Sequence, residues 1–140
     1  MSRMLGVAAI LATGLLLAAC SWGGPGRELQ GEWRLTEAAD GEGAMDLKGS
    51  TVTMWLEEDS ARSDGPCNIL QFELRGGPGD VEVELGPITE RACLDQDLMV
   101  IESRYVQALG EVTTAEVDGD TLTLSGDGTL LTWIRVTGSS

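Results

Sequence analysis

The sequence predicts an α+β fold: a curved antiparallel sheet or open barrel of about seven or eight short strands, with one helix packed against it. Three observations predict it. Short segments alternate apolar and polar residues with a period of two, as half-buried strands do. Turn residues such as Asp118-Gly119 separate these segments, which is typical of tight hairpins. Only residues 96–109 have a helical period, and strands and helices do not alternate along the chain.

The first half of the chain contributes most of the strands. They are expected at residues 32–37, 51–57, 60–62, 69–74 and 81–85. Trp33, Trp55 and Trp133 each lie in an alternating strand, which favours the core for all three. Trp55 faces away from its apolar neighbours, however, so exposure is the alternative for this residue. In residues 69–74 we expect a bulge near Leu70, because the apolar residues otherwise need a register change to face the core.

One helix is expected after Cys93. Asp95 is its predicted N-cap, since the carboxylate can accept hydrogen bonds from the free amides of the first turn. The apolar face of this helix consists of Leu98, Ile101, Tyr105 and Leu109. We expect Gly110 to follow the helix as its C′ residue.

The end of the chain predicts a meander of strands at residues 112–117, 120–124 and 129–136. Asp118-Gly119 is a strong signal for a tight hairpin between the first two. The Ser-Gly-Asp-Gly segment at residues 125–128 joins the last two.

The N-terminus predicts export and lipid attachment. Residues 5–19 form an uncharged apolar run, which is shorter than the roughly 20 residues of a bilayer-spanning helix and typical of a signal peptide. The run ends in Leu17-Ala18-Ala19-Cys20, which resembles the lipobox of bacterial lipoproteins. An ordinary secretory leader with a coincidental cysteine is the alternative.

The predicted parts are a signal peptide (1–19), the lipid-bearing Cys20 with a flexible tether (20–28), and one domain (29–137). Two acyl chains would hold that domain on the extracytoplasmic face of the cell membrane.

Two cysteines remain once Cys20 carries lipid, namely Cys67 and Cys93. An even remainder in an oxidising compartment indicates a disulfide. It would close a loop of roughly 27 residues and stabilise the domain by about 3 to 4 kcal/mol in the chain-entropy model. A free thiol pair and a metal site are the alternatives, but two cysteines without histidine cannot complete a closed zinc site.

Composition excludes several classes of function. The chain has 9 basic and 23 acidic residues and a formal charge of −14, which repels phosphate backbones, so we expect no nucleic-acid partner. It has no histidine, which removes Ser-His-Asp and Cys-His catalysis and the commonest zinc ligand. We expect no metal and no cofactor, and a monomer whose envelope partner the sequence does not name.

Two acidic clusters are candidates for chemistry. Asp118, Asp120 and Asp127 offer oxygen ligands for calcium, but their spacing differs from that of an EF-hand loop, and hairpin turns account for them. The run at residues 57–59 (Glu-Glu-Asp) could supply acid and base only in a cleft that separates their pKa values, and a solvated turn is the better interpretation.

Asn68 and Arg91 are the polar residues that we consider for ligand binding. They adjoin the two cysteines, so a disulfide would bring them together. The alternative is that both satisfy backbone groups around the turn.

Several motifs together resemble the META domain, the HslJ-like family. Gly65-Pro66-Cys67-Asn68 resembles the family's Gly-Cys-Asn turn, with Pro66 where a small residue is usual. Residues 88–93 are similar to its Thr-Thr-x-Met-Ala-Cys stretch, from which Glu90-Arg91 departs. The remaining matches are Trp33-x-Leu35, helical Glu102 with Tyr105 and Leu109, and the pattern at residues 118–124.

The resemblance implies that Cys67 and Cys93 are neighbours in space. It also implies an envelope protein without known enzymatic activity, in a family linked to heat shock and novobiocin tolerance. We therefore expect a membrane-anchored bacterial lipoprotein that is not an enzyme and whose domain binds or shields something in the cell envelope under stress. The alternatives are a disulfide-stapled inhibitor of another secreted protein and, third, a hydrolase that uses carboxylates alone.

Overall fold

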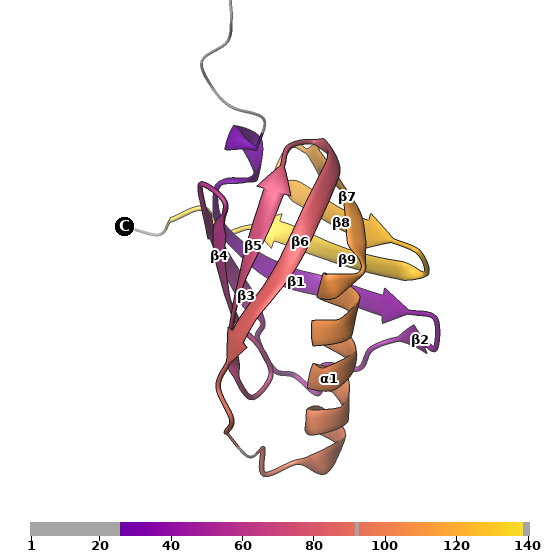
Figure 1. Ribbon diagram of the computed structural model, residues 1–140. Coiled ribbons are helices and arrows are strands. Elements are labelled where there is room, and N and C mark those ends of the chain that lie inside the picture. The colour runs from indigo at the N-terminus through magenta and orange to yellow at the C-terminus, as the bar shows by residue number, and fades with distance from the viewer. Residues whose placement is uncertain (1–25, 92, 139–140) are drawn as a thin grey trace, which may run out of the picture.

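The computed structural model describes residues 26–91 and 93–138. The predicted signal peptide, Cys20 and residues 21–25 of the predicted tether lie outside this range. In the described residues, one antiparallel sheet closes into a barrel, and α1 (Gln96–Gly110) packs against its side (Figure 1). The predicted α+β fold, an antiparallel barrel with one helix, is confirmed.

The strands follow one another around the barrel in nearly their chain order. Their bounds are β1 Gly31–Asp40, β2 Gly43–Ala44, β3 Thr53–Glu57, β4 Ser60–Asp64, β5 Ile69–Gly76, β6 Gly79–Ile88, β7 Val112–Asp118, β8 Thr121–Gly126 and β9 Thr129–Arg135, with a 3-10 turn η1 at Arg27–Leu29. Their order is β2-β1-β3-β4-β5-β6-β7-β8-β9. An additional pairing of β1 with β9 closes the ring.

β1 is longer than predicted because it pairs with two strands of the barrel, β3 and β9. Its first half pairs with β3, from Gly31 opposite Leu56 to Arg34 opposite Thr53. It also pairs with β9 along most of its length, with a register shift at Thr36. The Thr36 hydroxyl donates to the carbonyl of Thr132 at 3.1 Å, which supports the strand at this bulge.

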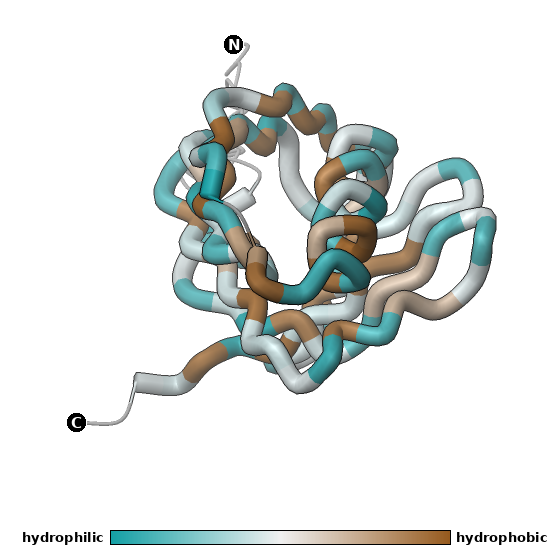
Figure 2. The backbone as a smooth tube through the Cα atoms, turned by 90° about the horizontal axis from the view of Figure 1, so that it is seen from below, coloured by the Kyte–Doolittle hydropathy of each residue, from teal (hydrophilic) through white to brown (hydrophobic). Residues whose placement is uncertain are grey.

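The core lies inside the barrel and under α1. Figure 2 shows hydrophobic and hydrophilic residues alternating along the strands, as a barrel with one buried face requires. Trp33 and Trp133 are fully buried, as expected. Trp55 is 37% exposed, because it occupies the outer position of β3 between the buried Met54 and Leu56. Of the two alternatives for Trp55, exposure is therefore the correct one.

The expected bulge near Leu70 exists, but the extra residue is in β6. β5 alternates regularly, with Leu70, Phe72 and Leu74 all buried, so no register change is needed within it. Leu70 pairs with Ile88 and Phe72 with Leu85, so β6 has one residue more than β5 in this interval.

The helix begins as predicted and ends differently. The Asp95 side chain accepts a hydrogen bond from the backbone N–H of Asp97 at 2.9 Å and caps the first turn. The prediction that Gly110 is a C′ residue is wrong: Gly110 is the last helical residue, and Glu111 is the C-cap with φ −95°. A Cβ on Gly110 would lie 3.1 Å from Cδ1 of Leu85, so a larger residue here would require this side chain to shift slightly.

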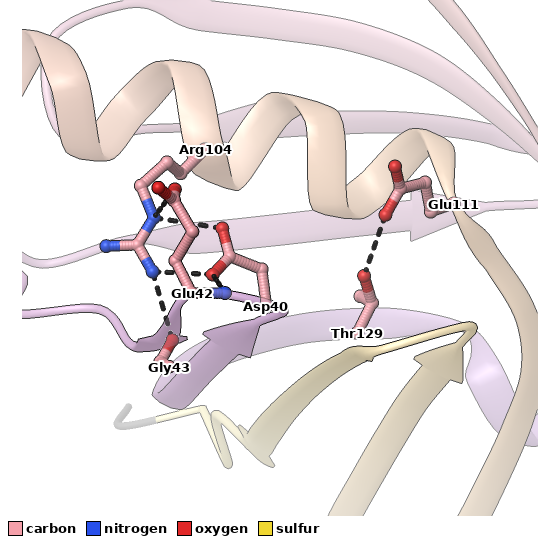
Figure 3. A network of polar contacts seen from close by, with 6 residues as sticks. All are labelled: Asp40, Glu42, Gly43, Arg104, Glu111 and Thr129. Atoms are coloured by element: carbon pink, nitrogen blue, oxygen red, sulfur yellow. Dashed lines mark hydrogen bonds and ion pairs between the residues drawn. The ribbon is translucent and has the colours of Figure 1, made fainter.

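Polar contacts hold α1 on the barrel (Figure 3). The Arg104 guanidinium donates to both carboxylate oxygens of Asp40, at 2.9 and 2.6 Å, and to the carbonyl of Gly43 at 3.0 Å. At the C-terminal end of the helix, the Thr129 hydroxyl donates to the carboxylate of Glu111 at 3.2 Å. These side chains connect α1 to β1, β2 and β9.

The pairing between β6 and β7 is short. Their pairing consists of Gly79 opposite Ala115 and Asp80 opposite Thr114. Beyond Asp80, β6 diverges from β7 and continues alongside α1 (Figure 1). β6 therefore borders two surfaces: the junction with α1 and the outer face of the sheet.

Candidate binding surface

The predicted disulfide between Cys67 and Cys93 is present, with their Cα atoms 5.5 Å apart. It links the turn between β4 and β5 to the segment that precedes α1. In that turn the backbone N–H of Gly65 donates to the carbonyl of Asn68 at 2.8 Å. Pro66 and Cys67 therefore lie between two residues that are hydrogen-bonded to each other at the end of the β4–β5 hairpin. The departure from the family pattern at Pro66 leaves the turn intact.

Asn68 and Arg91 are neighbours, but the Asn68 side chain contacts the backbone of Arg91 and not its side chain. The Asn68 side-chain oxygen accepts from the Arg91 N–H at 2.6 Å and from the Thr89 hydroxyl at 2.8 Å. Its nitrogen donates to the Arg91 carbonyl at 3.3 Å and to Glu102 at 2.6 Å. The amide of Asn68 thus uses its donors and acceptor within the protein. The Arg91 residue itself is exposed. That either residue binds a ligand stays a prediction.

Glu102 is the residue at this junction whose contacts the sequence reasoning missed. Its carboxylate also accepts from the backbone N–H groups of Cys67 and Asn68, at 2.6 and 2.7 Å. The residue is only 6% exposed. A signal was present in the sequence, because Glu102 lies between Ile101 and Tyr105 on the apolar face of the helix. A carboxylate on such a face requires internal donors.

A groove of about 570 Å³ lies over the outer face of β3, β4, β5 and β6. Outward-facing residues form two rows across the strands. Trp55 is opposite Arg62, and Arg62 is opposite Gln71. In the second row Ser60 lies between Glu57 and Glu73. This volume is within the range of small-molecule sites, about 300 to 1,000 Å³.

Trp55 is held at one wall of the groove by a charged neighbour. The Arg62 guanidinium carbon lies 5.6 Å from the centre of the Trp55 ring, a distance suited to a cation–π contact. Arg62 is fixed in turn by Asp64, whose carboxylate accepts from it at 3.0 and 3.1 Å. Arg62 therefore contacts the indole, while a large part of the Trp55 surface stays exposed.

The β6 bulge forms the opposite rim of the groove. Gly86 and Pro87 line it, next to Gln71. A Cβ on Gly86 would lie 2.9 Å from the carbonyl oxygen of Gln71, so only glycine allows the strands to approach this closely. The absence of a side chain at Gly86 keeps this rim of the groove low.

Two glutamates of the groove, Glu73 and Glu84, pair with one arginine beside it. Arg75 makes ion pairs with Glu73 and with Glu84, the latter at 3.1 Å. The charge of Glu73, followed by the hydrogen bond to Glu84, raises the pKa of Arg75. The carboxylates outnumber the guanidinium groups at this surface, and the groove shares the negative charge of the whole chain.

The other acidic candidates lie in turns. Glu58 and Asp59 form the exposed turn between β3 and β4, where Glu58 has a positive φ of 55°. Asp118 ends β7 in a hairpin with Gly119, and Asp127 lies in the turn between β8 and β9. Within residues 26–91 and 93–138, no group of three or more acidic or cysteine side chains is arranged to hold a metal ion.

The model of the META domain matches residues 27–137, which is most of the chain. The chain belongs to the META domain family. The family resemblance drawn from the motifs is thereby confirmed. The META family is not a known enzyme family.

A solved structure has the same fold as this META domain. It is an NMR structure of a protein from Burkholderia xenovorans, with a TM-score of 0.63 and 19% sequence identity. The alignment covers 99% of this chain and 100% of that chain. At this identity the likeness shows the fold alone. A comparison with curated proteins found no match. Among the described residues, no helix of the META domain has both the length and the apolar character needed to span a bilayer.

Proposed function

We propose that the protein is a lipid-anchored extracytoplasmic binding protein, attached through Cys20, and that the outer groove of its META domain is the binding surface. The observation that carries the anchoring is the apolar run that ends in Leu17-Ala18-Ala19-Cys20. The Cys67–Cys93 disulfide supports the same compartment, because disulfides persist outside the reducing cytoplasm.

The groove supports a binding role better than a catalytic one. A general acid and base need two groups whose environments separate their pKa values. In the groove, Glu73 and Glu84 share the same cation, Arg75, and both are exposed. The chain also has no histidine to act as a base near neutral pH. A carboxylate-only hydrolase therefore has little support.

The inhibitor alternative has one observation in its favour and one against it. A rigid disulfide-stapled domain suits an inhibitor, and Trp55 is an exposed aromatic anchor of the kind that dominates interfaces. Trp55 lies on a strand within a groove, however, and not on a protruding loop. A concave surface of this size is better suited to a ligand than to the active site of a partner.

Mass spectrometry of the mature protein tests the anchoring. We expect cleavage before Cys20, an added mass from acyl chains on that residue, and the loss of two hydrogens at Cys67 and Cys93. Cys20→Ser is the matched control, since it removes the acceptor thiol and leaves the domain unchanged. An uncleaved and unacylated chain in the soluble interior of the cell, with all thiols free, would contradict the proposal.

A role in envelope stress tolerance is the finer part of the proposal, and the family supports it. A deletion strain should lose survival after heat or novobiocin, and the full-length gene should restore it. The Cys20→Ser variant should not restore it if anchoring is required. Equal survival of the deletion strain and its parent would exclude this role under the conditions used.

A further inference from the structure

We propose that the groove over β3 to β6 binds a neutral or cationic saccharide chain, which stacks on Trp55 and forms hydrogen bonds to Gln71, Ser60 and Glu57. This inference deepens the proposed binding role by naming the class of ligand, and it rests on that role. It does not depend on the lipid anchor.

Trp55 supplies the stacking surface. The face of an aromatic ring carries partial negative charge, and the C–H bonds on one side of a pyranose ring carry partial positive charge, so the two surfaces attract each other. The indole is 37% exposed, and Arg62 lies 5.6 Å from its ring. A flat and partly apolar ring in an otherwise polar groove is a surface suited to a sugar.

Gln71, Ser60 and Glu57 supply the polar contacts. Within the described part of the chain, no hydrogen bond of their side chains is observed in the protein, unlike those of Arg62 and Arg75. An amide, a hydroxyl and a carboxylate together both donate and accept hydrogen bonds, as sugar hydroxyls require. Gln71 lies two strands from Trp55, which corresponds to about 10 Å at the spacing of a sheet. That distance suits a ligand of two or three sugar rings.

Charge restricts the kind of saccharide. The chain carries a formal charge of −14, and Arg62 of the groove and the nearby Arg75 are already paired with carboxylates. An anionic chain would therefore meet repulsion without a free cation to bind it. Neutral and amino-bearing chains are compatible with this surface.

The position of the groove favours a saccharide over a peptide. Extended peptides obtain much of their affinity from main-chain hydrogen bonds to a free strand edge. The groove lies over the face of the sheet, where β4 pairs with β3 on one side and β5 on the other. Its floor offers side chains but no free backbone groups of β4.

Titration of the mature acylated protein with trisaccharides tests the proposal. The protein is held in a zwitterionic detergent without a sugar headgroup, and its tryptophan fluorescence is followed. The probes are cellotriose, N-acetylated chitotriose, its deacetylated cationic form, and an anionic trigalacturonate. We expect at least one of the first three to bind, and the anionic probe to bind about tenfold more weakly or not at all.

Variants locate the site. Trp55→Ala should weaken binding by about tenfold or more, and Trp55→Phe should retain part of the affinity because it keeps an aromatic face. Gln71→Ala, an exposed substitution, should weaken binding without affecting folding. Ile134→Ala is the matched control, because Ile134 is an exposed apolar residue of β9 outside the groove and should leave binding unchanged.

The proposal is overturned if none of the four trisaccharides binds, or if Trp55→Ala and Gln71→Ala both bind as tightly as the parent. It is also overturned if an extended proline-rich peptide binds at Trp55 while the saccharides do not. The lipid anchor is measured separately by mass, so failure of saccharide binding and failure of anchoring are distinguishable.

Discussion

The side-chain amide of Asn68 donates a hydrogen bond of 2.6 Å to the carboxylate of Glu102, and this contact joins the β4–β5 turn to α1. The other oxygen of Glu102 accepts from the backbone of Cys67 and Asn68. One nearly buried carboxylate thus satisfies three donors at a point where the disulfide also links the same two segments.

Glu102→Ala should destabilise the protein by about 2 to 4 kcal/mol, because it removes the carboxylate and leaves its three donors without their acceptor. Denaturant unfolding followed by circular dichroism measures the loss. Ser103→Ala is the control: Ser103 is the next residue of α1, is exposed, and should change stability by less than about 0.5 kcal/mol. Equal midpoints for the two variants would show that the Glu102 contacts contribute little.

Removal of the disulfide should lower the free energy of unfolding by about 3 to 4 kcal/mol. The reason is the larger conformational freedom of the unfolded chain once Cys67 and Cys93, 26 positions apart, are no longer linked. The double variant Cys67→Ala/Cys93→Ala is compared with the oxidised parent in urea. Reductant should lower the midpoint of the parent and leave that of the double variant unchanged. A parent that is insensitive to reductant would contradict this account.

The protein should lose stability in acid because the carboxylate of Asp40 becomes protonated. The hydrogen bond from Arg104 lowers the pKa of Asp40 from 3.8 to about 2. Because the folded pKa is below that of the unfolded chain, the contribution of the ionised carboxylate is complete above about pH 4 and is lost as the pH falls toward 2. Asp40→Asn should therefore be less stable than the parent near neutral pH, and the difference should shrink between pH 4 and pH 2.

The matched control for Asp40 is Glu116→Gln, an exposed acid of β7. Its free energy of unfolding should equal that of the parent at every pH. A stability difference between Asp40→Asn and the parent that is constant from neutral pH to pH 2 would show that the ion pair with Arg104 does not couple folding to protonation.

Gly126→Ala should be strongly destabilising, by roughly 2 to 3 kcal/mol, because the added Cβ would overlap the backbone carbonyl of Glu111. Backbone atoms cannot rotate away as a flexible side chain can. Gly41→Ala is the control, since Gly41 lies in an exposed turn and a Cβ there meets no atom within 4 Å. Thermal unfolding of both variants measures the contrast. Similar melting temperatures would mean that β8 can move away from Glu111.

Local patterns were sufficient to predict most of the fold. The period-two alternation of β3, the Asp118-Gly119 hairpin and the Asp95 cap each depend on neighbouring residues, which a sequence displays directly. The end of α1 could not be predicted in this way. Leu85, which is distant in the sequence, lies close to Gly110, and Gly110 does not have a left-handed conformation.

The candidate site was predicted only in part, for the same reason. The pairing of Cys67 with Cys93 follows from counting cysteines, and the proximity of Asn68 to Arg91 follows from that pairing. The groove could not be deduced from the sequence, because Trp55, Gln71 and Gly86 come from three strands and meet only through their register. Alternation allowed an exposed Trp55, but it did not reveal what surrounds that side chain.

The pairing of β1 with β9 sets the order in which the molecule can form. Trp33 lies opposite Arg135, so two segments at opposite ends of the domain must meet before the cylinder is complete. A polypeptide that emerges N-terminus first, from a ribosome or through a membrane pore, cannot acquire this contact until its last strand has followed. The barrel therefore stays open until the whole domain has emerged, and only the closed barrel can resist unfolding.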